Sequence, residues 1–170
     1  MTVDFVHLHV RTEYSIADSV VRVPQLIRAA RRARMPAVAV TDRSNLFAMV
    51  KFYKAAIAQG IKPIIGADVW IEATASRSGQ SPLVLLCRNQ QGYRNLTRLL
   101  TLAYLEGQVD GRPVLRQNWL DRGHVRGLIA LSAGVHGDIG QALLAGKADL
   151  AARQLDQQVE LFNGDFFIFY

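Results

Sequence analysis

The sequence predicts an α/β fold with mostly parallel strands, and three observations support this class. Short apolar segments alternate along the chain with longer segments of helical periodicity. The apolar segments are continuous rather than alternating, which is typical of strands with both faces covered, as in a parallel sheet or barrel. Polar residues follow several of these segments, where a parallel fold places its working side chains.

The first half of the chain begins with an expected strand at residues 5–10, followed by an irregular polar segment. Pro24 suits the first turn of a helix that extends to about Arg34, and Met35-Pro36 ends it. A second strand is expected at residues 37–40. Ser44 or Asn45 can cap the next helix, which Gly60 ends. A third strand covers residues 62–65, and residues 69–73 continue as extended chain.

The second half has a Ser-rich loop at 74–82 and a strand at 83–87, followed by a helix at 92–103. A loop at 107–113 and at best a short helix at 116–121 precede a strand at 128–132. Helices are expected at 137–144 and 148–161, with a final strand at 166–170. Because an exposed aromatic edge strand would invite aggregation, we expect one domain, residues 1–170, truncated at its C-terminal end.

Composition narrows the possible environments of the chain. Twenty basic and 14 acidic residues give a net charge of +6, which permits a polyanionic partner without requiring one. The single cysteine, Cys87, cannot form an internal disulfide, so a reducing cytosol is the simplest compartment. No secretory signal is evident, and no apolar stretch approaches the ~18–20 residues of a membrane helix. We therefore expect a cytoplasmic protein without a membrane partner.

Candidate functional residues gather at the ends of the predicted strands. His7, His9 and Arg11 lie two apart and therefore share one face of a strand. Paired histidines with a nearby carboxylate, here Asp18, are a plausible half of a metal site, and an arginine in the series damages it.

The other strand ends add to the same expected rim, because the carboxyl ends of parallel strands meet at one edge. They carry Asp42 with Arg43, Asp68, and Gly134 near His136. A simpler alternative is that Asp42 stabilises the N-terminus of the following helix through its dipole.

Four segments make the sequence recognisable. They read FVHLHVRTEYSIAD, AVAVTDRSNLFAMVKFYKAAIAQGIKPIIGAD, QGYRNLTRLLTLAYLEG and GLIALSAG. They closely resemble the N-terminal PHP (polymerase and histidinol phosphatase) domain of bacterial DNA polymerase III α subunits. The resemblance implies a distorted PHP-type β/α barrel, of which only the N-terminal portion is present. The polymerase catalytic aspartates and their magnesium ions would lie further along the parent chain, and no cofactor is expected in this segment.

The resemblance also implies that the metal site of active PHP domains is degraded here. Where metal-binding members have ligands, His9, Asp18 and Asp68 are kept. Four other ligand positions carry residues that are not metal ligands, namely Arg11, Arg43, Pro82 and Gly134. We expect no catalytic residue and no bound metal in this segment. Further ligand positions of the family fall beyond Tyr170.

Arginine at a ligand position changes the electrostatics of the pocket, because a permanent cation repels a metal ion and donates no lone pair. Arg11 and Arg43 could instead satisfy Asp18 and Asp68 by charge-assisted hydrogen bonds. Our hypothesis is that these arginine–carboxylate pairs hold the shape of the pocket. The competing interpretation is that Arg43 faces solvent.

The remaining histidines and basic residues favour structural interpretations. His7 at a strand start is typical of a structural residue, His136 in its Gly-Val-His-Gly turn has no evident partner, and His124 is expected to be solvated. A basic helix face could contact phosphates, but no aromatic residues interleave with it. That face comprises Arg28, Arg31, Arg32 and Arg34. A solvated face is the favoured interpretation.

Three functions are therefore compared. The favoured one is a noncatalytic PHP module that stabilises the parent DNA-directed DNA polymerase and docks its proofreading exonuclease subunit. Contacts with other polymerase III holoenzyme subunits, and with DNA, would come through the parent protein. The alternatives are an active metal-dependent phosphoesterase or 3′–5′ exonuclease and a pure DNA-binding element.

Overall fold

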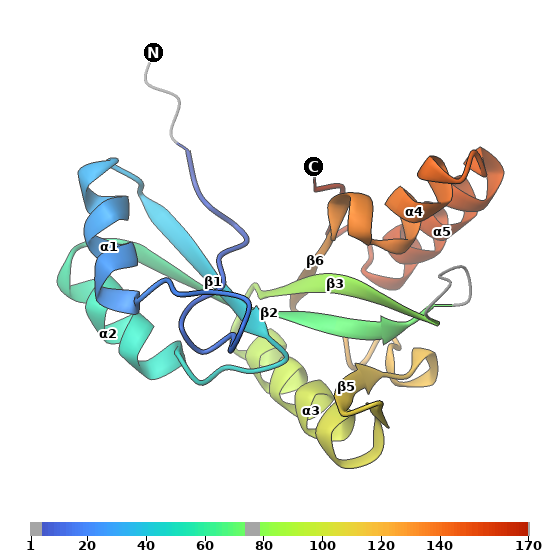
Figure 1. Ribbon diagram of the computed structural model, residues 1–170, viewed down its shortest axis with the longest axis horizontal. Coiled ribbons are helices and arrows are strands. Elements are labelled where there is room, and N and C mark those ends of the chain that lie inside the picture. Colours follow the sequence, from blue (N-terminus) through green and yellow to red (C-terminus); the bar gives the residue numbers. More distant parts are fainter. Residues whose placement is uncertain (1–4, 74–78, 170) are drawn as a thin grey trace. The chain divides into compact units, whose positions relative to one another are not determined.

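The computed structural model describes residues 5–73 and 79–169, and the chain forms two compact units, Met1–Ala67 and Asp68–Tyr170 (Figure 1). The first unit holds α1 (Val23–Arg32), β1 (Ala37–Arg43) and α2 (Met49–Ala58), and β2 (Lys62–Glu72) begins in it and ends in the second. The expectation of a single domain over residues 1–170 stays a prediction.

The second unit contains most of the sheet and the longer helices. Its further elements are β3 (Gln80–Cys87), α3 (Gln90–Glu106), β4 (Gln108–Val109), β5 (Arg112–Leu115), the 3-10 helix η1 (Gln117–Trp119), β6 (Leu128–Ser132), the 3-10 helix η2 (Gly134–His136), α4 (Asp138–Leu144), α5 (Ala148–Leu161) and β7 (Phe166–Phe167). No helix within the described ranges is long and apolar enough to span a membrane.

The core of the first unit lies between its two helices and β1. Ile27 of α1, Val38 of β1 and Phe52 of α2 are at most 2% exposed and belong to one cluster. The start of α1 agrees with the prediction, because proline occupies its first turn, where its missing N–H leaves no hydrogen bond unmade. Arg34 adopts a left-handed φ of 56° just after the helix, and β1 follows.

The sheet confirms the α/β class but is mixed rather than mostly parallel. In the second unit the strand order is β4-β5-β2-β3-β6-β7. The pairs β2–β5 and β6–β7 are parallel, whereas β3–β6 and β4–β5 are antiparallel. The part of the chain that the structure describes forms no closed barrel. Continuous apolar strands were interpreted as parallel because both faces are covered, but β3 and β6 are buried in an antiparallel pair.

The structure differs from the sequence prediction at residues 5–10 and at residues 107–113. Residues 5–10 form no regular strand; they run beside β1 with a single bridge between His7 and Val38. The predicted loop at 107–113 contains the hairpin β4–β5. Asp110 and Gly111 turn this hairpin, both with positive φ (50° and 76°), as a two-residue turn of the Asp-Gly type requires. Of the loop predicted at 74–82, residues 74–78 lie outside the described residues, and β3 begins at Gln80.

Cys87, at the end of β3, has a thiol of low reactivity. Burial raises the pKa of its thiol to about 12, so almost none of it is the reactive thiolate near neutral pH. We expect iodoacetamide at pH 8 to alkylate Cys87 more than about 100-fold more slowly in the native chain than in urea. Mass spectrometry of timed samples measures both rates. Equal rates in the two conditions would contradict the burial of this thiol.

Candidate functional site

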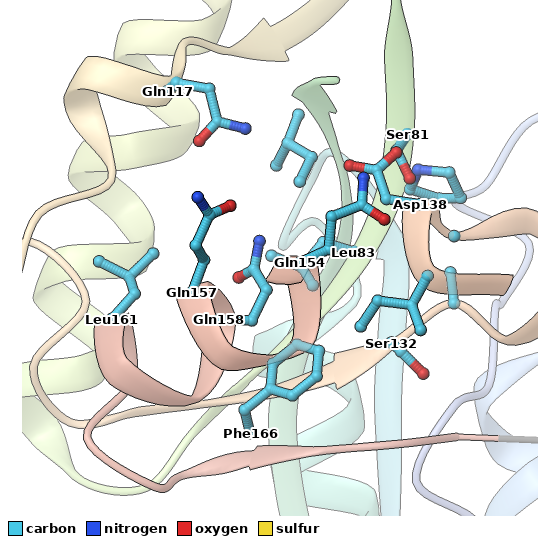
Figure 2. A pocket seen from close by; sticks show the side chains of 15 residues that line it. Ser81, Leu83, Gln117, Ser132, Asp138, Gln154, Gln157, Gln158, Leu161 and Phe166 are labelled. Carbon is cyan, nitrogen blue, oxygen red and sulfur yellow. The ribbon is translucent and has the colours of Figure 1, made fainter. Parts of the chain in front are cut away.

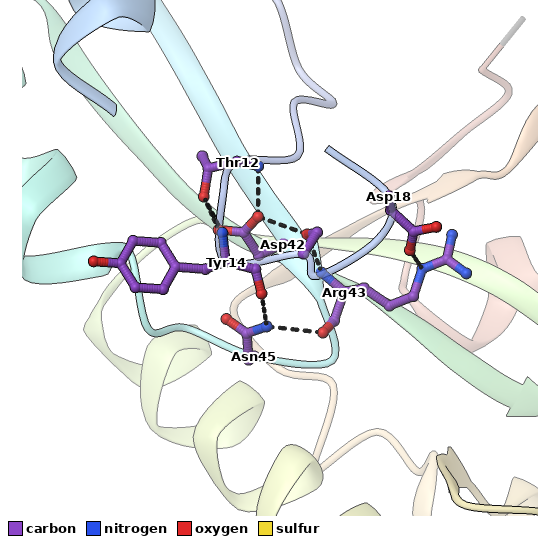
Figure 3. A network of polar contacts seen from close by, with 7 residues as sticks. Thr12, Tyr14, Asp18, Asp42, Arg43 and Asn45 are labelled. Carbon is purple, nitrogen blue, oxygen red and sulfur yellow. Dashed lines mark hydrogen bonds and ion pairs between the residues drawn. The ribbon is translucent and has the colours of Figure 1, made fainter. Parts of the chain in front are cut away.

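Asp42 is the centre of the polar network in the first unit (Figure 3). Its side chain, at the end of β1, is 1% exposed. Oδ1 accepts hydrogen bonds from the Thr12 backbone N–H at 2.6 Å and from Ser15 Oγ at 2.7 Å. Oδ2 accepts from Thr12 Oγ1 at 2.7 Å. A buried carboxylate is tolerated because polar donors surround it. Asp42 therefore anchors the 12–15 segment rather than the N-terminus of α2, which begins seven residues later at Met49.

The turn after β1 is tied to the same segment. The Arg43 backbone N–H donates to Ser15 Oγ at 3.0 Å, and Asn45 Nδ2 donates to the carbonyl oxygens of Tyr14 and Arg43 at 3.1 and 3.0 Å. Asn45 Oδ1 accepts from the Phe47 N–H at 3.0 Å, so its side chain is used within the turn. The prediction that Ser44 or Asn45 caps α2 is wrong: Ala48 occupies the cap position, without a side-chain bond.

This network presents Arg43 to Asp18. Arg43 Nε lies 3.1 Å from Asp18 Oδ2, with 29% and 36% of the two side chains exposed (Figure 3). Both residues therefore lie at the border between interior and solvent, where an ion pair contributes only about 1 kcal/mol or less. Two of the predicted ligand positions, Asp18 and Arg43, are thus brought together.

The other predicted ligand positions are distributed over both units. In the first, His9 and Arg11 are half-buried in the irregular segment beside β1. In the second, Asp68 is 2% exposed on β2, Pro82 lies on β3, and Gly134 begins η2 with φ 55°. The predicted pairing of Arg11 and Asp68 with carboxylate or arginine partners stays a prediction.

The residues at the predicted ligand positions are chemically unsuited to hold a metal ion. Arg11 and Arg43 carry no lone pair for a cation, and neither proline nor glycine offers a side-chain ligand. Within residues 5–73 and 79–169, no three His, Cys, Asp or Glu residues are grouped so that they could hold a metal ion.

The other three histidines lie outside the polar network around Asp42. His7 is exposed and packs edge-to-face against Phe5, with ring centroids 4.8 Å apart. His124, expected in solvent, instead contacts Asp121 Oδ2 through Nδ1 at 2.9 Å. The His124 backbone N–H is the main cause of the lowered pKa of Asp121. His136 is exposed on η2.

The basic residues of α1 and its C-terminal end are exposed to solvent. They are Arg28, Arg31, Arg32 and Arg34. Arg31 Nη1 donates to the Gln59 carbonyl oxygen, so this side chain links α1 to the end of α2.

The Arg43–Asp18 contact makes a modest contribution that can be measured. We expect Arg43→Ala to lower the free energy of unfolding by about 1 kcal/mol, because the ion pair and the packing of the arginine stem are both lost. Urea unfolding of Arg43→Ala, Asp18→Asn and the double variant isolates the coupling between the two side chains. Arg28→Ala, an exposed arginine of the same unit, is the control and should cost less than about 0.5 kcal/mol. A coupling energy of zero would leave Arg43 without a role in holding Asp18.

Comparison with known proteins places this chain in a family. A family profile described as the PHP domain matches residues 7–168. The chain belongs to the PHP family. The recognition from sequence motifs is confirmed by relatives named DNA polymerase III subunit alpha. The one from Pseudomonas aeruginosa is 46% identical over 168 residues, covering 99% of this chain, and the one from Escherichia coli K12 is 38% identical over 164 residues, covering 96%. This PHP chain spans about 14% of the length of each.

Solved structures give a weaker likeness. An amidohydrolase from Chromobacterium violaceum covers 58% of this PHP chain, with 19% identity and a TM-score of 0.48, and the match takes in 32% of that protein. A putative metal-dependent phosphoesterase from Bifidobacterium adolescentis covers the same share, with 14% identity and a TM-score of 0.45. Similarity at this level carries no argument about the chemistry of this chain.

Proposed function

We propose that this chain is the N-terminal PHP module of a bacterial DNA polymerase III α subunit and has no reaction of its own. It contributes the first portion of a PHP-type β/α barrel, stabilises the cytoplasmic polymerase, and docks the proofreading exonuclease subunit. DNA synthesis, with its magnesium ions, belongs to later parts of the parent protein. The length of the α-subunit relatives, of which this chain spans about 14%, supports a module within a larger protein.

One observation carries the noncatalytic part of the proposal. Arg43 lies against Asp18 at 3.1 Å, so a carboxylate kept from the family's ligand set faces a fixed cation. A metal ion at this carboxylate would have to displace the guanidinium and withstand its charge at close range. Metal-assisted hydrolysis needs a cation that activates water and neutralises phosphoryl charge. The arginine supplies a positive charge but cannot lower the pKa of a bound water as a coordinated metal does.

An activity assay separates this proposal from the active phosphoesterase or exonuclease. We expect the purified chain to show no hydrolysis of p-nitrophenyl phosphate or of a 3′-labelled oligonucleotide above buffer, with Mn²⁺ or Zn²⁺ added. Asp18→Asn is the matched variant for any signal that does occur. Turnover that requires added metal and disappears in Asp18→Asn would establish the enzyme instead.

Docking of the exonuclease subunit is tested in the full α subunit, where the PHP module has its natural continuation. Exposed large apolar side chains on α2, Val50 (57% exposed) and Ile57 (54%), are suitable positions for glutamate substitutions. Leu105→Glu on α3, where the leucine is 75% exposed, is the control. Calorimetry with the purified exonuclease subunit should show binding to the unmodified α subunit. Failure to bind would remove the docking role. Weaker binding by the two α2 variants, with Leu105→Glu unaffected, would place part of the contact on α2.

A further inference from the structure

A pocket of about 290 Å³ with mixed polar and apolar walls lies within the second unit (Figure 2). It is lined by residues of α5, of the start of α4, of η1 and of strands β2, β3, β6 and β7. Its volume is at the lower end of the range for small-molecule sites, and it is several times the roughly 30 Å³ that one water occupies in the liquid. The pocket is therefore large enough for a small organic group.

The pocket faces away from the Asp68 side of the sheet. Side chains alternate along a strand, so Ile71, which lines the pocket, projects opposite to Asp68 on β2. Leu83 of β3 lines it as well, and its register partner on β6, Ser132, does too. Pro82, at the start of β3, also contributes to the lining. The pocket is thus built mainly on the other face of the sheet from the kept carboxylate Asp68.

Three buried oxygen atoms of the lining residues have no hydrogen-bond partner, namely Asp138 Oδ1, Gln154 Oε1 and Gln158 Oε1. The Ser81 hydroxyl hydrogen-bonds to the Asp138 side chain and so holds this carboxylate in place. Ser81 is 2% exposed. Figure 2 shows Ser81 beside Asp138, with Gln154, Gln157 and Gln158 of α5 around the same space. Because leaving a buried polar atom unmatched is unfavourable, atoms gathered around one cavity indicate a missing partner rather than scattered defects.

The chemistry of these atoms defines the partner. A carboxylate oxygen only accepts hydrogen bonds, and so do the two amide oxygens. Among the described residues that line the pocket, Asp138 is the only charged one, in a chain of net charge +6. Burial raises the pKa of Asp138, and a bound cation would oppose that shift. The missing partner is therefore a cation with several N–H donors.

Apolar side chains of the pocket would add selectivity for a ligand that carries a hydrocarbon part. Leu83, Ile139, Leu161 and Phe166 line the pocket along with the polar groups. They can pack against the methylene groups of a ligand whose charged end reaches Asp138. A guanidinium presents five N–H donors in a plane and pairs with a carboxylate through parallel hydrogen bonds, whereas an ammonium carries only three.

We propose that this pocket binds an alkylguanidinium group, with Asp138 as the anion and the side-chain oxygens of Gln154 and Gln158 as hydrogen-bond acceptors around it. The group is chemically the arginine side chain, supplied either as a free small molecule or within a peptide. One ionised carboxylate and two neutral amides favour such an organic cation over a divalent metal ion, which prefers several charged ligands.

A pair of probes of equal shape tests the charge requirement. We expect n-propylguanidinium to bind the purified chain saturably at one site by calorimetry, and the neutral isostere n-propylurea to bind at least about tenfold more weakly. Asp138→Asn should weaken n-propylguanidinium binding by at least about tenfold. Asp156→Asn, an exposed aspartate of α5, should leave it unchanged. Circular dichroism verifies that both variants are folded.

Other outcomes overturn the proposal or identify the source of the ligand. Absence of binding by either probe would show that the pocket holds water only. Equal binding of the two probes, or binding indifferent to both Asp138→Asn and Gln158→Leu, would show that the pocket does not select a guanidinium group; each of these results overturns the proposal. If the charge requirement holds, L-arginine is compared with a blocked Gly-Arg-Gly peptide. Tighter binding of the amino acid identifies a free small molecule as the ligand, and tighter binding of the peptide identifies a protein side chain; either result supports the alkylguanidinium site.

Discussion

Replacement of Asp42 by alanine is expected to lower the free energy of unfolding by about 4 kcal/mol. The substitution removes the acceptor of three hydrogen bonds, from the Thr12 N–H, Thr12 Oγ1 and Ser15 Oγ, at a side chain that is 1% exposed. The donors left behind are buried with it, so each loses a charged partner without gaining water. Urea unfolding followed by circular dichroism measures the effect.

Two further variants make this prediction specific. Asp42→Asn keeps the shape but loses the charge and turns one acceptor into a donor, so a loss of about 2 kcal/mol is expected. Asp156→Ala removes an exposed carboxylate and should change stability by less than about 0.5 kcal/mol. If Asp42→Ala were as mild as Asp156→Ala, the network would not hold the 12–15 segment against β1.

Replacement of Gly92 by alanine is expected to destabilise the chain by about 3 kcal/mol, although the residue lies within a helix. Alanine is ordinarily better than glycine in helices by up to about 1 kcal/mol. Here an added Cβ would stand 1.8 Å from the Gly127 carbonyl oxygen and 2.5 Å from its carbon. Both are backbone atoms, so α3 and the 127 turn would have to move apart.

A matched glycine tests whether space, rather than helix propensity, decides the result. An added Cβ at Gly123 meets only the Asp121 side chain, at 3.2 Å, so a movement of a few tenths of an ångström relieves the contact. Gly123→Ala should therefore change the unfolding free energy by less than about 1 kcal/mol. A stabilised Gly92→Ala would mean that α3 does not approach the 127 turn as closely as the structure has it.

The sequence predicts most of the regular elements because their signals are local. The apolar segments at 83–87 and 128–132 become β3 and β6, and the helical periodicity at 92–103 becomes the centre of α3. Strand direction is not encoded locally, so the antiparallel β3–β6 pair was missed. The β4–β5 hairpin was missed although its signal is present, since Asp110-Gly111 is a typical two-residue hairpin turn.

The sequence predicts several residues of the candidate site, but not the contacts that connect them. The sequence Thr41-Asp42-Arg43 predicts that Arg43 belongs to the candidate site, and Arg43 contacts Asp18 in the structure. Whether this pair replaces a metal ion stays a prediction. The central position of Asp42 was not foreseen, because its partners Thr12 and Ser15 lie 27 to 30 residues away. The Ser81–Asp138 pocket has no sequence signal, since its residues come from separate elements.

Metal binding by the purified chain tests the central claim most directly. Calorimetric titration with Mn²⁺ and with Zn²⁺, followed by elemental analysis after desalting, measures affinity and stoichiometry. Because the Arg43 guanidinium lies 3.1 Å from Asp18 Oδ2 and would repel a cation there, we expect no stoichiometric ion of either metal. One tightly held ion per chain, lost in Asp18→Asn and unaffected by Arg43→Ala, would contradict the account.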